Sequence, residues 1–213
     1  MTIDWQAIEI MHSDVKALPE SLRRLAADMK LVAGSVLAHV GSRPKFMYFV
    51  CQGELRLRRI SVNGTEVVLQ RCTSGFVAEA SLESSAYHCD VAVIENSQVL
   101  TFPIQAFRAI LREDVVFCQF WMARLAREVR TLRAQCERLA LRTASERVQH
   151  YIESEGRNGR LALRQTRKAW AAQLGLTHEA LYRTLATLVA DQVITLTQGQ
   201  NQLIITAIGA KRR

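Results

Sequence analysis

The sequence predicts an α+β protein built from three successive parts. Short apolar segments separated by turn residues predict an antiparallel β-roll of the jelly-roll type over residues 30–103. An unbroken heptad pattern then predicts one long helix. The remaining residues predict a small unit of helices followed by a β-hairpin. We therefore expect a β-roll domain at 1–112, a long coiled-coil helix at 113–141 and a C-terminal domain at 142–213.

The first part contains six segments with the length and apolar pattern of strands. They cover residues 36–40, 46–50, 55–60, 67–69, 91–94 and 99–102. Asn63-Gly64 lies between two of them and predicts a β-hairpin with a type I′ turn, because both central positions of that turn need positive φ. Ahead of the strands, residues 19–29 predict a short amphipathic helix that carries Leu22 and Leu25.

A seam of apolar residues runs along the predicted long helix. Its members are alternately three and four residues apart, the period of a two-stranded coiled coil. They are Val115, Cys118, Met122, Leu125, Val129, Leu132, Cys136 and Leu139. Arginines at 124, 127, 130, 133 and 138 are expected to keep the flanks charged and solvated. A helix buried within its own chain is the alternative, but no second helix of comparable length is predicted to cover the seam. We therefore expect a homodimer.

Composition and charge limit the classes of protein that remain. Of the 213 residues, 49% are hydrophobic and 23% are charged, which excludes a disordered chain. Five cysteines without metal-ligand spacing favour reduced thiols and a cytoplasmic location. No signal peptide or membrane-spanning segment is expected. The net charge of +8 is uneven, since residues 140–213 hold 11 Lys and Arg against 5 Asp and Glu. A basic C-terminal region is typical of nucleic-acid-binding proteins.

The sharpest functional signal is a pair of short helices with a turn between them. Thr166 and Thr177 can each cap a helix, and Gly175 predicts a turn residue with positive φ. In the second helix, expected at 177–190, one face is apolar through Leu181, Leu185 and Leu188. The opposite face carries His178, Glu179, Tyr182 and Arg183. Because a hairpin is predicted to follow, the pattern indicates a winged helix-turn-helix.

A helix-turn-helix presents the first turns of its second helix to base edges in the major groove of double-stranded DNA. Arginine can pair bidentately with guanine, and glutamate can accept a hydrogen bond from the cytosine amino group. We therefore predict that His178, Glu179, Tyr182 and Arg183 read bases. An ordinary solvated helix face is the alternative for these four residues.

In this order of parts the chain resembles the cyclic-AMP receptor protein/FNR (Crp/Fnr) family of bacterial transcription regulators over nearly its whole length. The matching residues are Gly53-Glu54-Leu55-Arg56-Leu57, Gly64-Thr-Glu66, Arg147 and Thr177-His-Glu-Ala-Leu-Tyr-Arg183, the last being similar to the family's Ser-Arg-Glu-Thr-x-x-Arg. The resemblance implies a cyclic-nucleotide-binding-like β-roll, a homodimer, and RNA polymerase as a partner if the protein is an activator.

The resemblance also implies roles for particular side chains. Glu179 and Arg183 match base-reading positions of the family, and His178 stands where many members have arginine. Arg167 matches a position that touches phosphate. We expect further phosphate contacts from Thr166, Lys168, Gln198 and Gln200.

The sequence departs from the family pattern at the effector pocket. Cyclic-nucleotide binders carry a Gly-Glu pair that holds the ribose and, about ten residues later, an Arg-Ser pair that grips the phosphate. Here these pairs read Ala78-Glu79 and Cys89-Asp90, and no arginine lies between positions 71 and 108. Asp90 without a cationic partner would repel a phosphate. Because Leu132 and Arg133 replace the residues that touch adenine, we expect no cyclic AMP, and any effector to lie near Glu79, Asp90, Leu132 and Arg133.

The other cofactors of the family place their own demands on the sequence. An iron–sulfur cluster needs cysteines near the N-terminus, and none precedes Cys51, so no cluster is expected. Haem stays open, with His12, His39, His88 and His150 as conceivable ligands, and a haem- or redox-sensing member of the family is therefore an alternative. A more distant one is a cupin-like enzyme or small-molecule-binding barrel, which needs clustered metal ligands. Since the histidines are isolated, we expect neither a metal site nor an enzyme.

Overall fold

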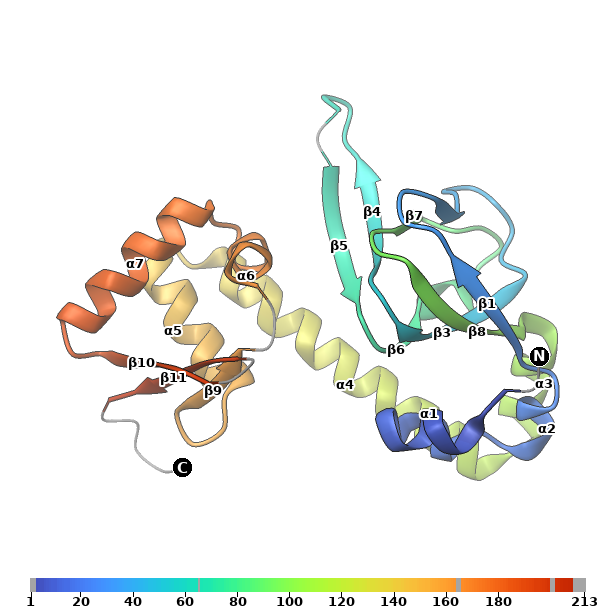
Figure 1. The fold of residues 1–213 in the computed structure, drawn as a ribbon. Helices are drawn as coiled ribbons and strands as arrows, with labels where there is room; N and C mark the ends of the chain where they lie inside the picture. The colour runs from blue at the N-terminus through green and yellow to red at the C-terminus, as the bar shows by residue number, and fades with distance from the viewer. Residues whose placement is uncertain (1–2, 65, 164–165, 200–201, 209–213) are drawn as a thin grey trace. The chain divides into compact units, whose positions relative to one another are not determined.

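The computed structural model describes residues 3–64, 66–163, 166–199 and 202–208. The chain forms two compact units, residues 1–123 and 124–213, which divide within the long helix α4 (Val115–Ala140). Figure 1 labels the elements of both units, and each unit is described here by itself. Among the described residues, no helix combines the length and the apolarity that crossing a membrane requires.

Two four-stranded antiparallel sheets form the core of the first unit. One has the order β1-β8-β3-β6, made of Ala27–Leu31, Ser97–Pro103, Phe46–Gln52 and Gly75–Val77. The other has the order β2-β7-β4-β5, made of Val36–Ala38, Asp90–Val93, Leu55–Ile60 and Glu66–Cys72. Alternate residues of both sheets, such as Val50, Leu55, Val91 and Val99, are fully buried in one cluster. The predicted β-roll is confirmed, and β1 and β6 are strands that the sequence did not predict.

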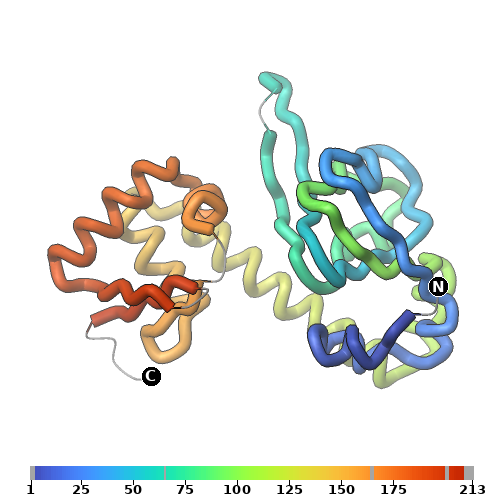
Figure 2. The backbone as a smooth tube through the Cα atoms, viewed as in Figure 1, coloured from blue at the N-terminus to red at the C-terminus, as the bar shows by residue number. Residues whose placement is uncertain are grey.

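The hairpin predicted around Asn63-Gly64 is present, but its turn is not of type I′. Strands β4 and β5 pair antiparallel along their length, as their adjacent courses in Figure 2 show. Gly64 has φ of 75° and donates its backbone N–H to the carbonyl of Ser61, whereas Asn63 does not have positive φ. The loop between Ile60 and Glu66 is longer than two residues, so only one left-handed residue is needed.

The helix predicted at 19–29 is much shorter than expected. Helix α2 covers only Glu20–Arg23 and follows α1 (Trp5–Met11) and a 3-10 turn (Ser13–Ala17). Leu22 is buried as predicted, but residues from Ala27 onward pair with β8 in the register Ala27↔Thr101. The helical pattern is overridden because pairing with β8, a strand distant in sequence, satisfies the backbone of this segment.

An aromatic cluster attaches the start of α4 to the β-roll. Helix α3 (Ile104–Glu113) contributes Phe107, and α4 contributes Phe117 and Trp121, all of them buried. The Trp121 ring lies 5.0 Å from the rings of both Phe76 and Phe107, in edge-to-face geometry that aromatic pairs favour. Helix α4 therefore has a buried aromatic face in addition to its apolar seam.

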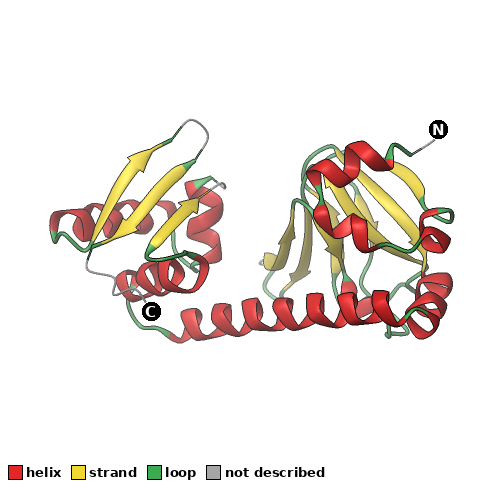
Figure 3. Cartoon of the chain, turned by 90° about the horizontal axis from the view of Figure 1, so that it is seen from below, coloured by secondary structure: helices red, strands yellow, loops and turns green. Residues whose placement is uncertain are grey.

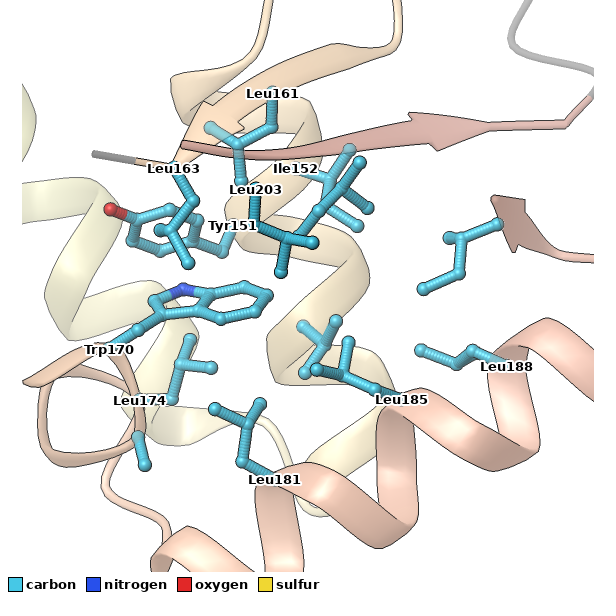
Figure 4. Packing of buried hydrophobic residues seen from close by; sticks show 14 residues of the cluster. Tyr151, Ile152, Leu161, Leu163, Trp170, Leu174, Leu181, Leu185, Leu188 and Leu203 are labelled. Atoms are coloured by element: carbon cyan, nitrogen blue, oxygen red, sulfur yellow. The ribbon is translucent and has the colours of Figure 1, made fainter. Parts of the chain in front are cut away.

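In addition to the last part of α4, the described residues of the second unit form three helices and a three-stranded sheet, drawn in red and yellow in Figure 3. The helices are α5 (Ala144–Glu155), α6 (Arg167–Gln173) and α7 (His178–Ala190), and the sheet has the order β10-β11-β9, from Ile194–Gln198, Leu203–Ala207 and Arg160–Leu163. Figure 4 shows Leu161, Leu163 and Leu203 of the sheet pointing toward the helices, with Trp170 between the two layers. Trp170 is fully buried, so a single core holds the helices against one face of the sheet.

Arg138, near the end of α4, is not a solvated flank of the helix as expected. Its side chain is only 1% exposed and packs with its guanidinium 4.5 Å from the centre of the Tyr151 ring on α5. Its Nη2 donates to Ser154 Oγ at 3.2 Å and to Glu155 Oε1 at 3.3 Å. Burial lowers the pKa of Arg138, and the nearby Glu155 carboxylate opposes that shift. The arginine thus joins the last turns of α4 to α5.

Candidate nucleic-acid interface

A tight turn joins α6 to α7 and fixes their junction. Thr166 Oγ1 accepts a hydrogen bond from the N–H of Ala169 at 3.2 Å and caps α6. At the other end, Gly175 has φ of 65°, and the N–H of Leu176 donates to the carbonyl of Ala171 at 2.9 Å. This is a Schellman ending, in which a left-handed residue closes the helix. The predicted cap and the predicted left-handed turn are both confirmed.

Arg147 of α5 forms hydrogen bonds to the backbone of this turn. Its Nη1 donates to the carbonyls of Leu174 and Gly175, both at 3.3 Å, and its Nε donates to the carbonyl of Leu141 at 3.1 Å. These carbonyls belong to helix ends, where backbone acceptors lack partners within the helix. Arg147 therefore ties the end of α4 to the turn before α7, a role that the sequence alone did not reveal.

Helix α7 has one buried and one exposed face. Thr177 Oγ1 accepts from the N–H of Ala180 at 3.1 Å and caps the helix, as predicted. The buried face consists of Leu181, Leu185 and Leu188. The exposed face carries His178, Glu179, Tyr182 and Arg183 within its first two turns. The structure thus gathers all four predicted base-reading residues on one accessible surface.

The N-terminus of α7 keeps the Glu179 carboxylate ionised. Glu179 is fully exposed, and its pKa is lowered because the carboxylate accepts hydrogen bonds from its own backbone N–H and from the Thr177 hydroxyl. The neighbouring His178 lowers it further. An ionised carboxylate is an acceptor only, so Glu179 can accept a hydrogen bond from an amino group but cannot donate one to phosphate.

The residues predicted to touch phosphate that the structure describes lie at the start of α6 and at the end of β10. Thr166, Lys168 and Gln198 are exposed. Arg167 is half-buried, and its guanidinium lies 4.9 Å from the centre of the Tyr182 ring on α7. Gln200 lies outside the described residues.

The four residues predicted to form an effector pocket fall in different units. Glu79 is buried in a 3-10 turn (Glu79–Ser81), and Ala78 before it has φ of 61°, a left-handed conformation that favours glycine. Asp90 Oδ1 accepts a hydrogen bond from the N–H of Val40 at 2.8 Å. Leu132 and Arg133 lie on the part of α4 that belongs to the second unit. Asp90, which stands at the position of the family's phosphate-gripping pair, thus already has a backbone hydrogen-bond partner.

Tyrosine and cysteine side chains lie in the interior of the β-roll. Tyr48, Tyr87 and Cys89 are buried in the same cluster as the strand residues. Burial raises the pKa of both tyrosines, so both phenols stay neutral at any physiological pH. A buried carboxylate of this unit is Glu54, which pairs with Arg56 at 2.6 Å and with Arg71. Sequence reasoning missed this carboxylate, because alternation alone does not distinguish a paired buried glutamate from an exposed one.

Cys51 and His12 of the first unit are engaged in the fold, whereas His39 and His88 are exposed. Burial and the nearby Asp28 carboxylate raise the pKa of Cys51 to about 11, which suppresses its reactive thiolate. His12 hydrogen-bonds through both ring nitrogens, to Ser74 Oγ at 2.8 Å and to the carbonyl of Cys51 at 2.9 Å. Among the described residues, no group of three or more His, Cys, Asp or Glu side chains is arranged to hold a metal ion.

Comparison with known proteins places the fold. Residues 28–114 match the cyclic nucleotide-binding domain family. FixK2 from Bradyrhizobium japonicum has the same fold, with 22% identity, coverage of 87% of this chain and 93% of that one, and a TM-score of 0.63. The c-di-GMP responsive global regulator CLP of Xanthomonas campestris has 17% identity, coverage of 89% of this chain and 98% of that one, and a TM-score of 0.60. DNR from Pseudomonas aeruginosa has 20% identity, coverage of 95% of this chain and 93% of that one, and a TM-score of 0.51. No curated protein sequence matches the chain.

In its first unit the chain is therefore similar to the cyclic nucleotide-binding domain family. The predicted resemblance to the Crp/Fnr family is confirmed at the level of the fold, since the solved structures of the regulators FixK2, CLP and DNR share the fold over 87%, 89% and 95% of this chain.

Proposed function

We propose that the chain is a sequence-specific DNA-binding transcription regulator whose second unit is a winged helix-turn-helix. One observation carries the proposal: α7 buries one face in the core and exposes His178, Glu179, Tyr182 and Arg183 beside its capped N-terminus. This is the part of a recognition helix that enters the major groove. The hairpin of β10 and β11 would serve as the wing. We expect such a protein to act in the cytoplasm, where it would also meet RNA polymerase if it activates transcription.

We further propose that two copies associate through the seam of α4. Seam residues Val115 and Met122 are 66% and 65% exposed, and Val129, Leu132 and Leu139 are also exposed large apolar side chains. Phe117 and Trp121 on another face are already buried against the β-roll, so they cannot compete for the same contact. A second copy of the seam would remove these side chains from water in coiled-coil packing. A two-fold dimer would also present two recognition helices to successive major grooves about 34 Å apart.

We propose that the β-roll does not bind cyclic AMP or cyclic GMP. Asp90 already accepts a backbone hydrogen bond, Arg71 is committed to Glu54, and the interior holds neutral tyrosines where a phosphate would need a cation. Calorimetry should show dissociation constants weaker than about 1 mM for both nucleotides. Micromolar binding of either would overturn this part of the proposal.

DNA reading is tested by selecting bound duplexes from a random pool and measuring affinity on the selected and on unrelated sequences. A dimer should select a palindrome with half-sites about 10 bp apart, centre to centre. Arg183→Ala should weaken binding to the selected duplex by about 5- to 150-fold, and binding to unrelated DNA far less.

Lys168→Ala is the matched control, because it removes one exposed cation from the neighbouring helix. It should weaken both kinds of duplex alike and lower the salt slope by roughly one unit. Equal losses on both duplexes for the two variants would mean that α7 does not read bases.

A further inference from the structure

One aromatic side chain contacts residues of both helices at the proposed DNA interface. Tyr182 lies four residues after His178 on α7, so the two side chains are neighbours on the helix surface. Their ring centres are 4.5 Å apart with the planes at 62°, an edge-to-face contact. On α6, the Arg167 guanidinium lies 4.9 Å from the centre of the same ring. Tyr182 therefore contacts a residue proposed to read bases and a residue proposed to touch phosphate.

The two contacts restrict the side chains that make them. The face of an aromatic ring attracts a guanidinium electrostatically, which favours the Arg167 rotamer that lies over Tyr182. A long arginine side chain loses much rotamer freedom when it binds, and an arginine held in place beforehand loses less. His178 has its ring fixed in the same way by the edge-to-face contact. Side chains at the start of α6 and of α7 thus contact one residue, Tyr182, which is itself 43% exposed.

We infer that Tyr182 is a positioning residue that couples the phosphate contact of Arg167 to base reading by His178. The inference rests on the proposed function and changes one expectation from the sequence, in which Tyr182 itself reads a base. Arg167 would engage a phosphate from the rotamer that lies over the ring, and the same ring holds His178, so the loss of either contact lets the ring and the other side chain move. Both contacts are made by the ring and not by the hydroxyl. Tyr182→Phe should therefore keep both contacts, whereas Tyr182→Leu keeps an apolar side chain but removes the aromatic face that makes them.

The arrangement itself can be tested without DNA, by NMR of the His178 ring protons in the full chain. The chain has five histidines, and His178→Gln identifies the signal. Tyr182→Phe should leave the ring-current shift of His178 nearly unchanged, and Tyr182→Leu should remove it. A His178 signal that is the same in the wild type and in Tyr182→Leu would overturn the inference.

The coupling is tested by double-mutant cycles on the selected duplex. Arg167→Ala and His178→Ala are measured singly and together, first in the wild type and then in Tyr182→Phe and Tyr182→Leu. We expect the double variant to differ from the product of the single effects by about threefold or more in the wild type and in Tyr182→Phe, and to equal that product in Tyr182→Leu. The cycle of Lys168→Ala with His178→Ala is the control, and its effects should multiply.

Three results would overturn the inference. The first is independent effects of Arg167 and His178 in the wild type, and the second is coupling that survives in Tyr182→Leu. The third is a loss of base discrimination in Tyr182→Phe, which would show that the hydroxyl reads the base directly. A wild-type chain that selects no duplex would instead overturn the proposed function, and the inference with it, even where the NMR contact is present.

Discussion

Replacing Gly175 with alanine should destabilise the second unit by about 0.5–1.5 kcal/mol. Gly175 has φ of +65°, a conformation that costs an L-residue about 1–2 kcal/mol. The added Cβ would lie 3.1 Å from Leu139 Cδ2 and 3.3 Å from Arg147 Nη1. Both atoms end flexible side chains, so a shift of a few tenths of an ångström relieves the crowding at a small further cost. The lower unfolded-state entropy of alanine offsets part of the total, by about 0.4–1 kcal/mol.

The assay must separate the two units, because a chain with two units need not unfold in one transition. Hydrogen exchange read by mass spectrometry along a urea series gives a free energy of unfolding for peptides of each unit. Gly175→Ala should lower that value for residues 166–190 and leave the β-roll unchanged. Gly41→Ala is the control, since Gly41 has φ of +80° and a Cβ added to it would meet no atom within 4 Å beyond its chain neighbours. This control should affect the β-roll alone.

A change of less than a few tenths of a kcal/mol in the stability of the second unit of Gly175→Ala would contradict this prediction. A loss of about 4 kcal/mol would contradict it as well, because the crowding of the added Cβ would then cost more than the positive φ at this residue.

Three further predictions follow from other elements. Thr177→Ala should cost the second unit about 1 kcal/mol in the same exchange assay, because the cap of α7 is lost. The double variant Leu125→Glu, Leu132→Glu should be a monomer in analytical ultracentrifugation, because it places like charges in the seam of the proposed dimer. A wild type that is monomeric at micromolar concentration would contradict dimerisation through this seam. Burial by itself would raise the pKa of Glu54. Hydrogen bonds from Arg71 and Arg56, together with their positive charges, outweigh burial, so the pKa of Glu54 is lowered. Its stabilising effect is therefore present above its ordinary pKa of 4.5 and lost as the pH falls below it, so the stability gap between wild type and Glu54→Gln should narrow in acid.

Features that depend on nearby residues could be predicted from the sequence. The caps at Thr166 and Thr177 and the left-handed turn at Gly175 are all present, because each involves partners within four or five residues. The strands of the β-roll with period 2 and the buried face of α7 also agree with the prediction from the sequence. Burial on one face of a strand or helix imposes the hydrophobic period of that element directly.

The candidate interface was predicted in part. The exposed face of α7 follows from helical period once its leucines are buried. The contact of Arg167 with Tyr182 could not be predicted, because it depends on the angle between α6 and α7 that the turn sets. The α7 side of that surface was therefore foreseen, whereas its link to α6 was not.

The sequence by itself determined the order of the parts, their periods and their local ends, since these depend on short-range sterics and hydrogen bonds. Only the tertiary structure decided that residues 27–31 form a strand, that Trp121 of α4 packs against the β-roll, and that Arg138 is buried. Each of these outcomes depends on a partner brought close by the fold: β8 for the strand, Phe76 for the tryptophan and Tyr151 for the arginine. The free energy of such contacts exceeds local preference, and no pattern within one segment contains it.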